Sequence, residues 1–262
     1  PGFHYLYSRL NDPEPESGCA TLEPALVDGQ LRMRSVEPSQ QKHWDWKAAG
    51  NFICGGSGSG LFAFTAIASL RYDEFAPLGW AALGVVALGL FLVLLKIGRP
   101  LRFINVLRQP QRSWMAREAW IAAVLFPLAG LALWSQAPAP LIAAAIVAML
   151  FLYSQAMILK EARGIPAWRI SWVVPLVFAT GLAEGGGLFL AATAQFVSFR
   201  PLVELVAVAV IALAALRALI WRYYQAALEG DGAPTRTFAI FHDYRPWFFI
   251  AGLALPSALI VA

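Results

Sequence analysis

The sequence has few charged residues for its length. Only 14% of its 262 residues are Asp, Glu, Lys or Arg, whereas a water-soluble domain carries about 25%. Hydrophobic residues make up 59% of the chain, against roughly 45–50% in a soluble domain, and the mean hydropathy is +0.60. This composition argues against a soluble enzyme domain and against intrinsic disorder, and it indicates an integral membrane protein.

Cysteine and histidine are also scarce, which limits the cofactors that the chain could hold itself. The two cysteines, Cys19 and Cys54, are far apart and no CxxC motif is present, which excludes a self-contained iron–sulfur cluster, a zinc ribbon and a disulfide scaffold. None of the three histidines, His4, His43 and His242, falls inside an apolar stretch, where the axial ligands of a membrane haem would have to lie. We therefore expect no haem or iron–sulfur cluster in this chain, and any electron transfer would use a bound small molecule such as a quinone.

Long apolar runs predict an all-α integral membrane protein. A helix needs roughly 20 apolar residues to cross the hydrocarbon core of a bilayer. Seven stretches meet this requirement and predict seven transmembrane helices: 48–70, 78–97, 118–136, 138–158, 171–197, 201–222 and 246–262.

The basic residues are distributed very unevenly over the connecting segments. Of the 20 Lys and Arg residues, 18 fall at one set of helix ends and connections, and only Arg71 and Arg200 fall at the other. This count places Arg217 at the end of the sixth span. The positive-inside rule then puts the N-terminus and the basic loops in the cytoplasm, and we expect a multi-pass protein of the bacterial inner membrane.

Two halves of the chain show weak similarity to each other. A shift of 127 residues aligns Gly58-Ser59-Gly60-Leu61-Phe62 with Gly185-Gly186-Gly187-Leu188-Phe189, and Trp120 with Trp247. This spacing suggests a two-fold repeat of four-helix units, with an eighth helix expected after Ala262; chance similarity is the alternative.

Glycine is concentrated in two of the expected spans. The run Gly55-Gly56-Ser57-Gly58-Ser59-Gly60 lies in the first span with no preceding strand, which argues against a dinucleotide-binding loop. Gly56 and Gly60 are four residues apart, a spacing typical of close helix–helix packing in membranes. A face of small residues would also leave space for a flat ring. Gly181 and 185–187 in the fifth span favour the same interpretation.

Glu184 lies near the middle of the 27-residue stretch 171–197. An ionisable group at that depth is costly, so it faces the protein interior and marks a pathway or a site. Two interpretations remain open: a proton pathway, and a protonated structural glutamate with a hydrogen bond. The first would also suit a different class of protein, a repeat-built transporter or proton channel that uses Glu184.

Several polar side chains are expected at one depth near the cytoplasmic boundary. A quinone ring needs hydrogen-bonding groups at its carbonyls and a route for protons to water, and Asn, Tyr, His and carboxylate side chains supply both. For each residue alone, interfacial solvation or helix capping is the alternative. The candidate quinone-binding residues are Asn51, Arg117, Glu118, Tyr153 and His242.

The basic connection between the second and third spans is distinctive. Apolar and basic residues alternate over 96–108, which suggests a short amphipathic helix at the membrane surface. Ser113 is placed to cap the third helix, with Glu118 near its positive end. Arg99, Arg102 and Arg108 are expected to contact an acidic partner or lipid phosphates.

The same connection carries a resemblance to a known family. The segment GRPLRFINVLRQPQRSWMAREAW resembles the GRP-x-R…N…SWM-x-RE signature of membrane-anchor subunits of molybdopterin oxidoreductases, the dimethyl sulfoxide reductase anchor and polysulfide reductase NrfD-like families. The segment WDWKAAGNFICGGSGSGL also resembles anchors of phenylacetyl-CoA:acceptor oxidoreductase-like enzymes. The matching positions are Gly98, Arg99, Pro100, Arg102, Ser113, Trp114, Met115, Arg117 and Glu118.

The resemblance implies a haem-free anchor, often of eight helices, that docks an iron–sulfur (ferredoxin-like) subunit and a molybdopterin catalytic subunit. It further implies exchange of electrons and protons with a membrane quinone, either menaquinone or ubiquinone. In the polysulfide reductase branch, first-helix polar residues and a fourth-helix tyrosine line the quinone pocket, and Asn51 and Tyr153 match them. That branch has a histidine where this chain has Gly55, and His43 or His242 would take its place. An anchor without a quinone site is the third hypothesis.

The first 43 residues form a polar extension before the membrane domain at 44–262. The sequence Asp12-Pro13-Glu14-Pro15-Glu16 cannot form a regular helix. The extension is either a disordered tail or an arm that docks the iron–sulfur subunit through the aromatic residues at 3–7.

Overall fold

A computed structural model describes residues 22–27, 30–35, 44–96, 107, 110–111, 113–162, 165–193, 200–231, 238, 241–246 and 250. Within these residues, six helices are long and apolar enough to cross a membrane. They are α2 (Trp46–Ser69), α3 (Ala76–Lys96), α4 (Trp114–Ser135), α5 (Pro138–Glu161), α7 (Val173–Thr193) and α8 (Arg200–Gly230). The prediction of an all-α membrane protein is confirmed, and the six helices match the first six expected spans. Of the seventh expected span, 246–262, only Pro246 and Ile250 are among the described residues.

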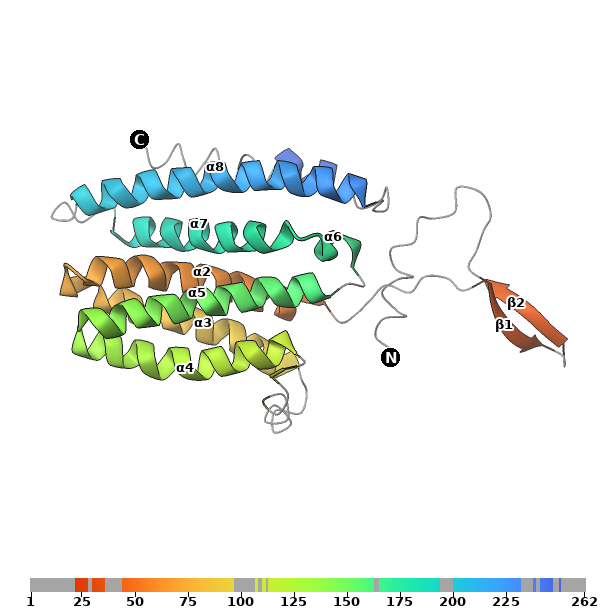
Figure 1. Ribbon diagram of the computed structural model, residues 1–262, viewed down its shortest axis with the longest axis horizontal. Helices are drawn as coiled ribbons and strands as arrows, with labels where there is room; N and C mark the ends of the chain where they lie inside the picture. Colours follow the sequence, from red (N-terminus) through yellow and green to blue (C-terminus); the bar gives the residue numbers. More distant parts are fainter. Residues whose placement is uncertain are drawn as a thin grey trace.

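The six long helices lie side by side with their axes roughly aligned (Figure 1). Helices adjacent in the sequence pack as the hairpins α2–α3, α4–α5 and α7–α8, and α2 also packs against α5 and α7. A short 3₁₀ turn, η1 (Asp73–Phe75), leads into α3, and a one-turn helix, α6 (Pro166–Arg169), precedes α7. The connection between α4 and α5 is tight, because only Gln136 and Ala137 separate the two helices.

Helix α2 occupies the centre because its glycines let neighbouring backbones approach closely. A methyl group on Gly60 would lie 3.0 Å from the carbonyl carbon of Gly181 and 3.2 Å from the Cα of Gly185, both in α7. A methyl group on Gly58 would lie 2.9 Å from the Val86 nitrogen in α3. The predicted packing role of the glycine run is confirmed. In the suggested two-fold repeat, α2 and α7 are equivalent helices of the two units, and they pack against each other. The repeat itself stays a prediction.

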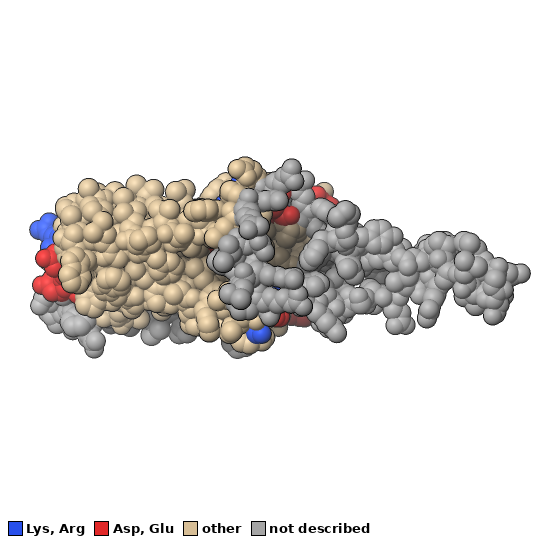
Figure 2. Space-filling model, turned by 90° about the horizontal axis from the view of Figure 1, so that it is seen from below, with Lys and Arg blue, Asp and Glu red and all other residues tan. Residues whose placement is uncertain are grey.

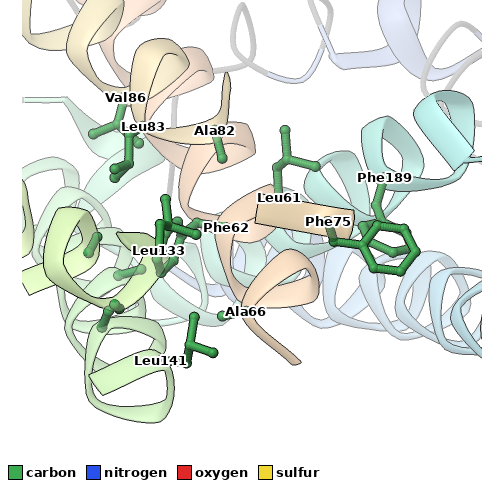
Figure 3. Close-up of a cluster of buried hydrophobic side chains, with 14 of the residues drawn as sticks. Leu61, Phe62, Ala66, Phe75, Ala82, Leu83, Val86, Leu133, Leu141 and Phe189 are labelled. Atoms are coloured by element: carbon green, nitrogen blue, oxygen red, sulfur yellow. The ribbon is translucent and has the colours of Figure 1, made fainter. Parts of the chain in front are cut away.

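The apolar core fills the space between α2 and its neighbours. Figure 3 shows Leu61 and Phe62 of α2 among side chains from α3, α4, α5 and α7. Phe75 and Phe189 pack with their ring centroids 5.4 Å apart and are almost fully buried. In α2 and α7, this core lies in the C-terminal halves of the helices.

Charged residues lie at the two ends of the bundle. In Figure 2, Lys, Arg, Asp and Glu side chains of the described residues lie at the ends, with a broad band of other side chains between them. At one end, Arg200 and Glu204 form an exposed ion pair at 3.0 Å. The uncharged band is the surface expected to face lipid.

Helix α8 is longer than the sequence indicated, and this changes the position of one arginine. The expected span ended at residue 222, but α8 continues to Gly230. Arg217 therefore lies in the middle of a 31-residue helix, where it is 7% exposed. Arg217 is therefore not at the end of the helix, because hydrophobicity alone does not show where a helix stops; its assignment to the cytoplasmic side stays a prediction.

Part of the N-terminal extension forms a β-hairpin. Strand β1 (Leu22–Val27) pairs antiparallel with β2 (Gln30–Ser35), with Leu26 opposite Leu31. Only two residues, Asp28 and Gly29, separate the strands in the sequence, and this pair is typical of tight hairpin turns. The interpretation of the whole extension as a disordered tail is therefore wrong for 22–27 and 30–35, and residues 3–7 lie outside the described residues.

Candidate functional site

Three buried polar side chains from three helices meet near one end of the bundle. Asn51 of α2, Glu118 of α4 and Gln155 of α5 are 3%, 6% and 0% exposed, and we call them the polar cluster. The Gln155 Nε2 group donates to the Glu118 Oε1 atom at 3.0 Å and to the main-chain oxygen of Asn51 at 3.2 Å. The Asn51 side chain also lies close enough to the Glu118 carboxyl to interact with it.

The members of the polar cluster share a depth, although they are distant in the sequence. Each lies four to six residues inside the nearest helix end, at Trp46, Trp114 or Glu161. At 1.5 Å per residue, this places all three about 6–9 Å below the helix ends. A carboxyl group in an apolar helix bundle is costly unless hydrogen bonds satisfy it, and here the Gln155 amide supplies one.

Two acceptors of the polar cluster remain open. Among the described residues, neither the Oδ1 atom of Asn51 nor the Oε1 atom of Gln155 has a hydrogen-bond partner. Buried polar atoms are nearly always paired, so an open acceptor at this depth marks a place for a hydrogen-bond donor. The cluster can thus hold a proton on Glu118 and accept hydrogen bonds from a further group.

Gly55 creates the space that Gln155 occupies. A methyl group on Gly55 would lie 2.6 Å from the Gln155 Cδ atom, closer than real contacts allow. The space that a side chain at position 55 would take is therefore filled by a glutamine from another helix. The sequence suggested His43 or His242 as the histidine of the site. His242 is exposed, and His43 lies outside the described residues.

Tyr153 and Arg117 form a second group at the surface. Tyr153 is 40% exposed and its ring centroid lies 5.8 Å from that of Trp114. The guanidinium carbon of Arg117 lies 4.2 Å from the Trp114 ring centroid, and its nitrogens donate to the main-chain oxygens of Pro110 at 2.8 Å and Gln111 at 3.0 Å. In the described part of the chain, these contacts link Tyr153 and Arg117 to Trp114 and the preceding loop and not to Glu118.

The rest of the basic connection is only partly described. Arg99, Arg102 and Arg108, with the expected amphipathic helix, lie outside the described residues. The end of the connection is held to α4, because the Trp120 indole donates to the main-chain oxygen of Leu107 at 3.0 Å. Ser113 is the N-cap residue of α4, as expected, but its side chain makes no capping hydrogen bond.

An ion pair joins the beginning of α2 to the end of α3 above the polar cluster. The Lys96 Nζ and Asp45 Oδ1 atoms are 3.3 Å apart, and Lys96 also lies 5.9 Å from the Trp44 ring centroid. Desolvation pushes the pKa of Asp45 upward, but the hydrogen bond from the Ala48 amide and the interactions with Lys96 outweigh it. The pKa of Asp45 therefore lies below its ordinary value of 3.8.

A second pair of charged residues lies deep between α7 and α8. Glu184 is half-buried near the middle of α7, and its charge interacts with that of Arg217 in α8. The sequence indicated Glu184 but not this partner, because Arg217 was assigned to the end of the helix. The attraction between their opposite charges lowers the cost of placing two ionisable side chains among apolar helices.

Gln155 is the member of the polar cluster that the sequence did not reveal. It lies within an apolar run and belongs to no motif, and only its polarity at the depth of Asn51 and Glu118 could have pointed to it. In the described ranges, no three His, Cys, Asp or Glu side chains gather in a way that could hold a metal ion.

The fold and its uncharged band define a multi-pass, all-α integral membrane protein. A family model for the DMSO reductase anchor subunit (DmsC) matches residues 52–255, which is most of the chain. The chain therefore belongs to the family of DMSO reductase anchor subunits, the membrane anchors of molybdopterin oxidoreductase complexes. Neither the curated proteins nor the solved structures give a significant match.

Proposed function

We propose that this chain is a haem-free anchor that exchanges electrons and protons with a membrane quinone at the polar cluster. The quinone, menaquinone or ubiquinone, would be the diffusing carrier, and the electrons would pass to or from an iron–sulfur subunit docked on the cytoplasmic face. A molybdopterin catalytic subunit would complete the complex. The family supports the anchor role, and the quinone exchange and the partner subunits are the proposal.

The observation that carries the proposal is the buried carboxyl of Glu118, which accepts a hydrogen bond from Gln155 and lies beside the Asn51 side chain. Reduction of a quinone takes up protons as well as electrons, so its site needs a group that can pass a proton close to the ring. Glu118 is such a group, and Asn51 beside it supplies hydrogen bonds to orient a ring oxygen. Both were expected from the sequence, and they contact each other in the structure.

The position of the cluster suits a site for electron transfer. It lies about 6–9 Å inside the helix ends that are next to the basic connections, where the positive-inside rule places the cytoplasm. We propose that Arg99, Arg102 and Arg108 contact an acidic partner or lipid phosphates there. On the same side, residues 1–43 would form an arm that holds the iron–sulfur subunit.

The proposal is tested on the complex purified from native bacterial membranes. We expect an iron–sulfur subunit and a large molybdenum subunit to co-purify with the chain. Glu118→Gln should lower quinone-coupled turnover at least about a hundredfold, as expected for the loss of a proton-transfer group, and leave turnover with an artificial dye unchanged. Asn51→Leu should also lower quinone-coupled turnover selectively.

Glu204→Gln is the matched control. Glu204 is an exposed carboxylate at the opposite end of the bundle, paired with Arg200, so its loss should leave both activities unchanged. Normal quinone turnover in both Glu118→Gln and Asn51→Leu would refute the site, and purification of the chain without redox subunits would refute the anchor role.

The Glu184–Arg217 pair favours a second function, a proton pathway through the membrane domain. A charged pair midway through α7 and α8 is where a protonatable relay would be expected. The pathway could operate within the anchor or, as the alternative hypothesis states, in a transporter or channel. Proton uptake by liposomes that contain only this chain, abolished by Glu184→Gln, would support the alternative; impermeable liposomes would exclude it.

A further inference from the structure

The β-hairpin of the N-terminal extension has two outer edges that no other described strand covers. Strands β1 and β2 form a two-stranded sheet, and Figure 1 shows no third strand beside them among the described residues. A two-stranded hairpin is at best marginally stable in water, and an uncovered edge pairs readily with a further strand. We propose that β2 is a docking edge that pairs with an acidic strand of a redox subunit. The inference rests on the proposed function, because it needs such a subunit on the cytoplasmic side.

The register decides which main-chain groups of the hairpin point outward. Strands joined by a two-residue turn exchange both main-chain hydrogen bonds at the pair next to the turn, here Val27 and Gln30. Hydrogen-bonded and non-hydrogen-bonded pairs alternate along an antiparallel ladder. The next pair, Leu26 and Leu31, is therefore non-hydrogen-bonded, and so is every second pair beyond it. At these pairs the N–H and C=O groups point away from the other strand.

Pro24 makes the outer edges of the two strands unequal. It lies opposite Met33, two positions beyond the Leu26–Leu31 pair, so its nitrogen belongs to the outer edge of β1. Proline has no N–H group, so it is tolerated at this position but leaves the outer edge of β1 without one donor. The outer edge of β2 keeps the N–H groups of Leu31, Met33 and Ser35. A further strand can therefore form a continuous ladder with β2 and not with β1.

The sequence of β2 favours an acidic partner strand. Arg32 and Arg34 alternate with apolar residues, so both arginines belong to one face of the sheet. Opposite charges at facing positions of neighbouring strands stabilise a sheet, and like charges destabilise it. Strand β1 places Glu23 opposite Arg34 but the uncharged Ala25 opposite Arg32. A partner strand with carboxylates opposite the two arginines and apolar residues between them would match β2 at each position.

A second copy of this chain would fit the same edge poorly. If two β2 strands paired antiparallel about Met33, Arg32 of each copy would lie opposite Arg34 of the other copy. Two like-charged pairs would then face each other across the new ladder, which is destabilising. The charge of β2 therefore favours a strand from a different polypeptide.

Hydrogen exchange of main-chain amides in the purified complex, resolved to single residues by mass spectrometry, tests the edge directly. Leu26 and Leu31 lie opposite each other, and their N–H groups point to opposite outer edges. We expect the Leu31 amide to exchange at least about tenfold more slowly than the Leu26 amide, because only Leu31 donates to a partner strand. Equal exchange at the two leucines, or slower exchange at Leu26, would overturn the inference.

Two proline variants test whether a redox subunit covers the edge. Leu31→Pro removes one donor from the edge of β2, and Leu26→Pro removes the facing donor from the edge of β1; both lose the same leucine pair. Any damage to the hairpin itself is therefore shared. Mass photometry of the complex over a dilution series measures the Kd for release of the redox subunits. This Kd should be about tenfold higher in Leu31→Pro than in Leu26→Pro, the factor that about 1.4 kcal/mol gives.

A pair of charge variants tests the chemistry of the partner strand. Arg32→Glu should raise the same Kd about tenfold above that of Ala25→Glu, which places a carboxylate at the facing position of β1. The Kd of the wild type should also rise with salt, because ions screen the attraction between exposed charges. Equal Kd values for Arg32→Glu and Ala25→Glu would contradict an acidic partner strand.

The outcomes separate this inference from the proposed function. If Leu31→Pro and Leu26→Pro release the redox subunits equally, another segment or a second copy covers the edge, and the inference is overturned while the anchor role stands. If no redox subunit co-purifies with the wild type, the proposed function fails and the inference fails with it.

Discussion

The glycine contact of α2 with α7 brings two helix backbones close together, and it can be tested by adding one methyl group. In Gly185→Ala, the new methyl group would lie 2.5 Å from the Cα atom of Gly60. The neighbouring atoms belong to the backbone, so no side-chain rotation relieves the contact. The Leu61 nitrogen and the Gly60 carbonyl carbon lie closer still. Ordinary contact begins at 3.4 Å, and the helices must therefore separate by at least about 0.9 Å.

Two opposing effects set the size of the change. Overpacking of a tight interface costs typically about 1–3 kcal/mol, whereas replacement of glycine by alanine within a helix gains up to about 1 kcal/mol. We therefore expect a net loss of about 1–2 kcal/mol in the free energy of unfolding. Gly187→Ala is the matched control, because no atom lies within 4 Å of its added methyl group, and it should be neutral or slightly stabilising.

Thermal unfolding in detergent, followed by tryptophan fluorescence, compares the two variants. At about 2–4 °C for each kcal/mol in a chain of this size, Gly185→Ala should lower the Tm by about 2–8 °C. A Tm for Gly185→Ala equal to that of Gly187→Ala would show that the two helices do not meet at their glycines.

Three further predictions concern single interactions. Replacing Glu184 or Arg217 alone by Gln should lower the free energy of unfolding by roughly 1–3 kcal/mol, and the double variant should lose less than the sum, as a double-mutant cycle by chemical unfolding would show. Asp45→Asn should be less stable than the wild type at pH 7. The difference should disappear as the pH falls below 3.8 through the lowered pKa of Asp45, and a Tm difference that persists at lower pH would contradict this. Tyr224→Phe should lose about 1 kcal/mol, because the hydroxyl donates to the Ala167 main-chain oxygen at 2.6 Å; an unchanged Tm would contradict it.

The spans were predictable because a lipid bilayer imposes one simple requirement. Every backbone group must be satisfied within the chain, so each run of about 20 apolar residues forms a helix. The six described helices follow the first six runs, with shifts of a few residues at most boundaries. The largest departure is the end of α8, because nothing in the apolar pattern shows that the helix continues into polar sequence as far as Gly230.

The candidate site was only partly predictable, because depth can be read along the chain and helix face cannot. Asn51 and Glu118 were grouped by depth, and they do meet. Tyr153 was chosen at a similar depth in the fourth span, but its neighbour Gln155 is the buried residue. Two residues along a helix differ by about 200° in direction, so Tyr153 faces outward where Gln155 faces α2.

Composition and spacing determined by themselves that this chain is a membrane protein, where its helices lie and that close packing occurs at its glycines. These follow from local properties: hydrophobicity, helix length and side-chain size. Only the tertiary structure decided that Gln155 fills the space beside Gly55 and that Arg217 lies opposite Glu184. Both arrangements depend on how one helix is rotated against another, which no local pattern records.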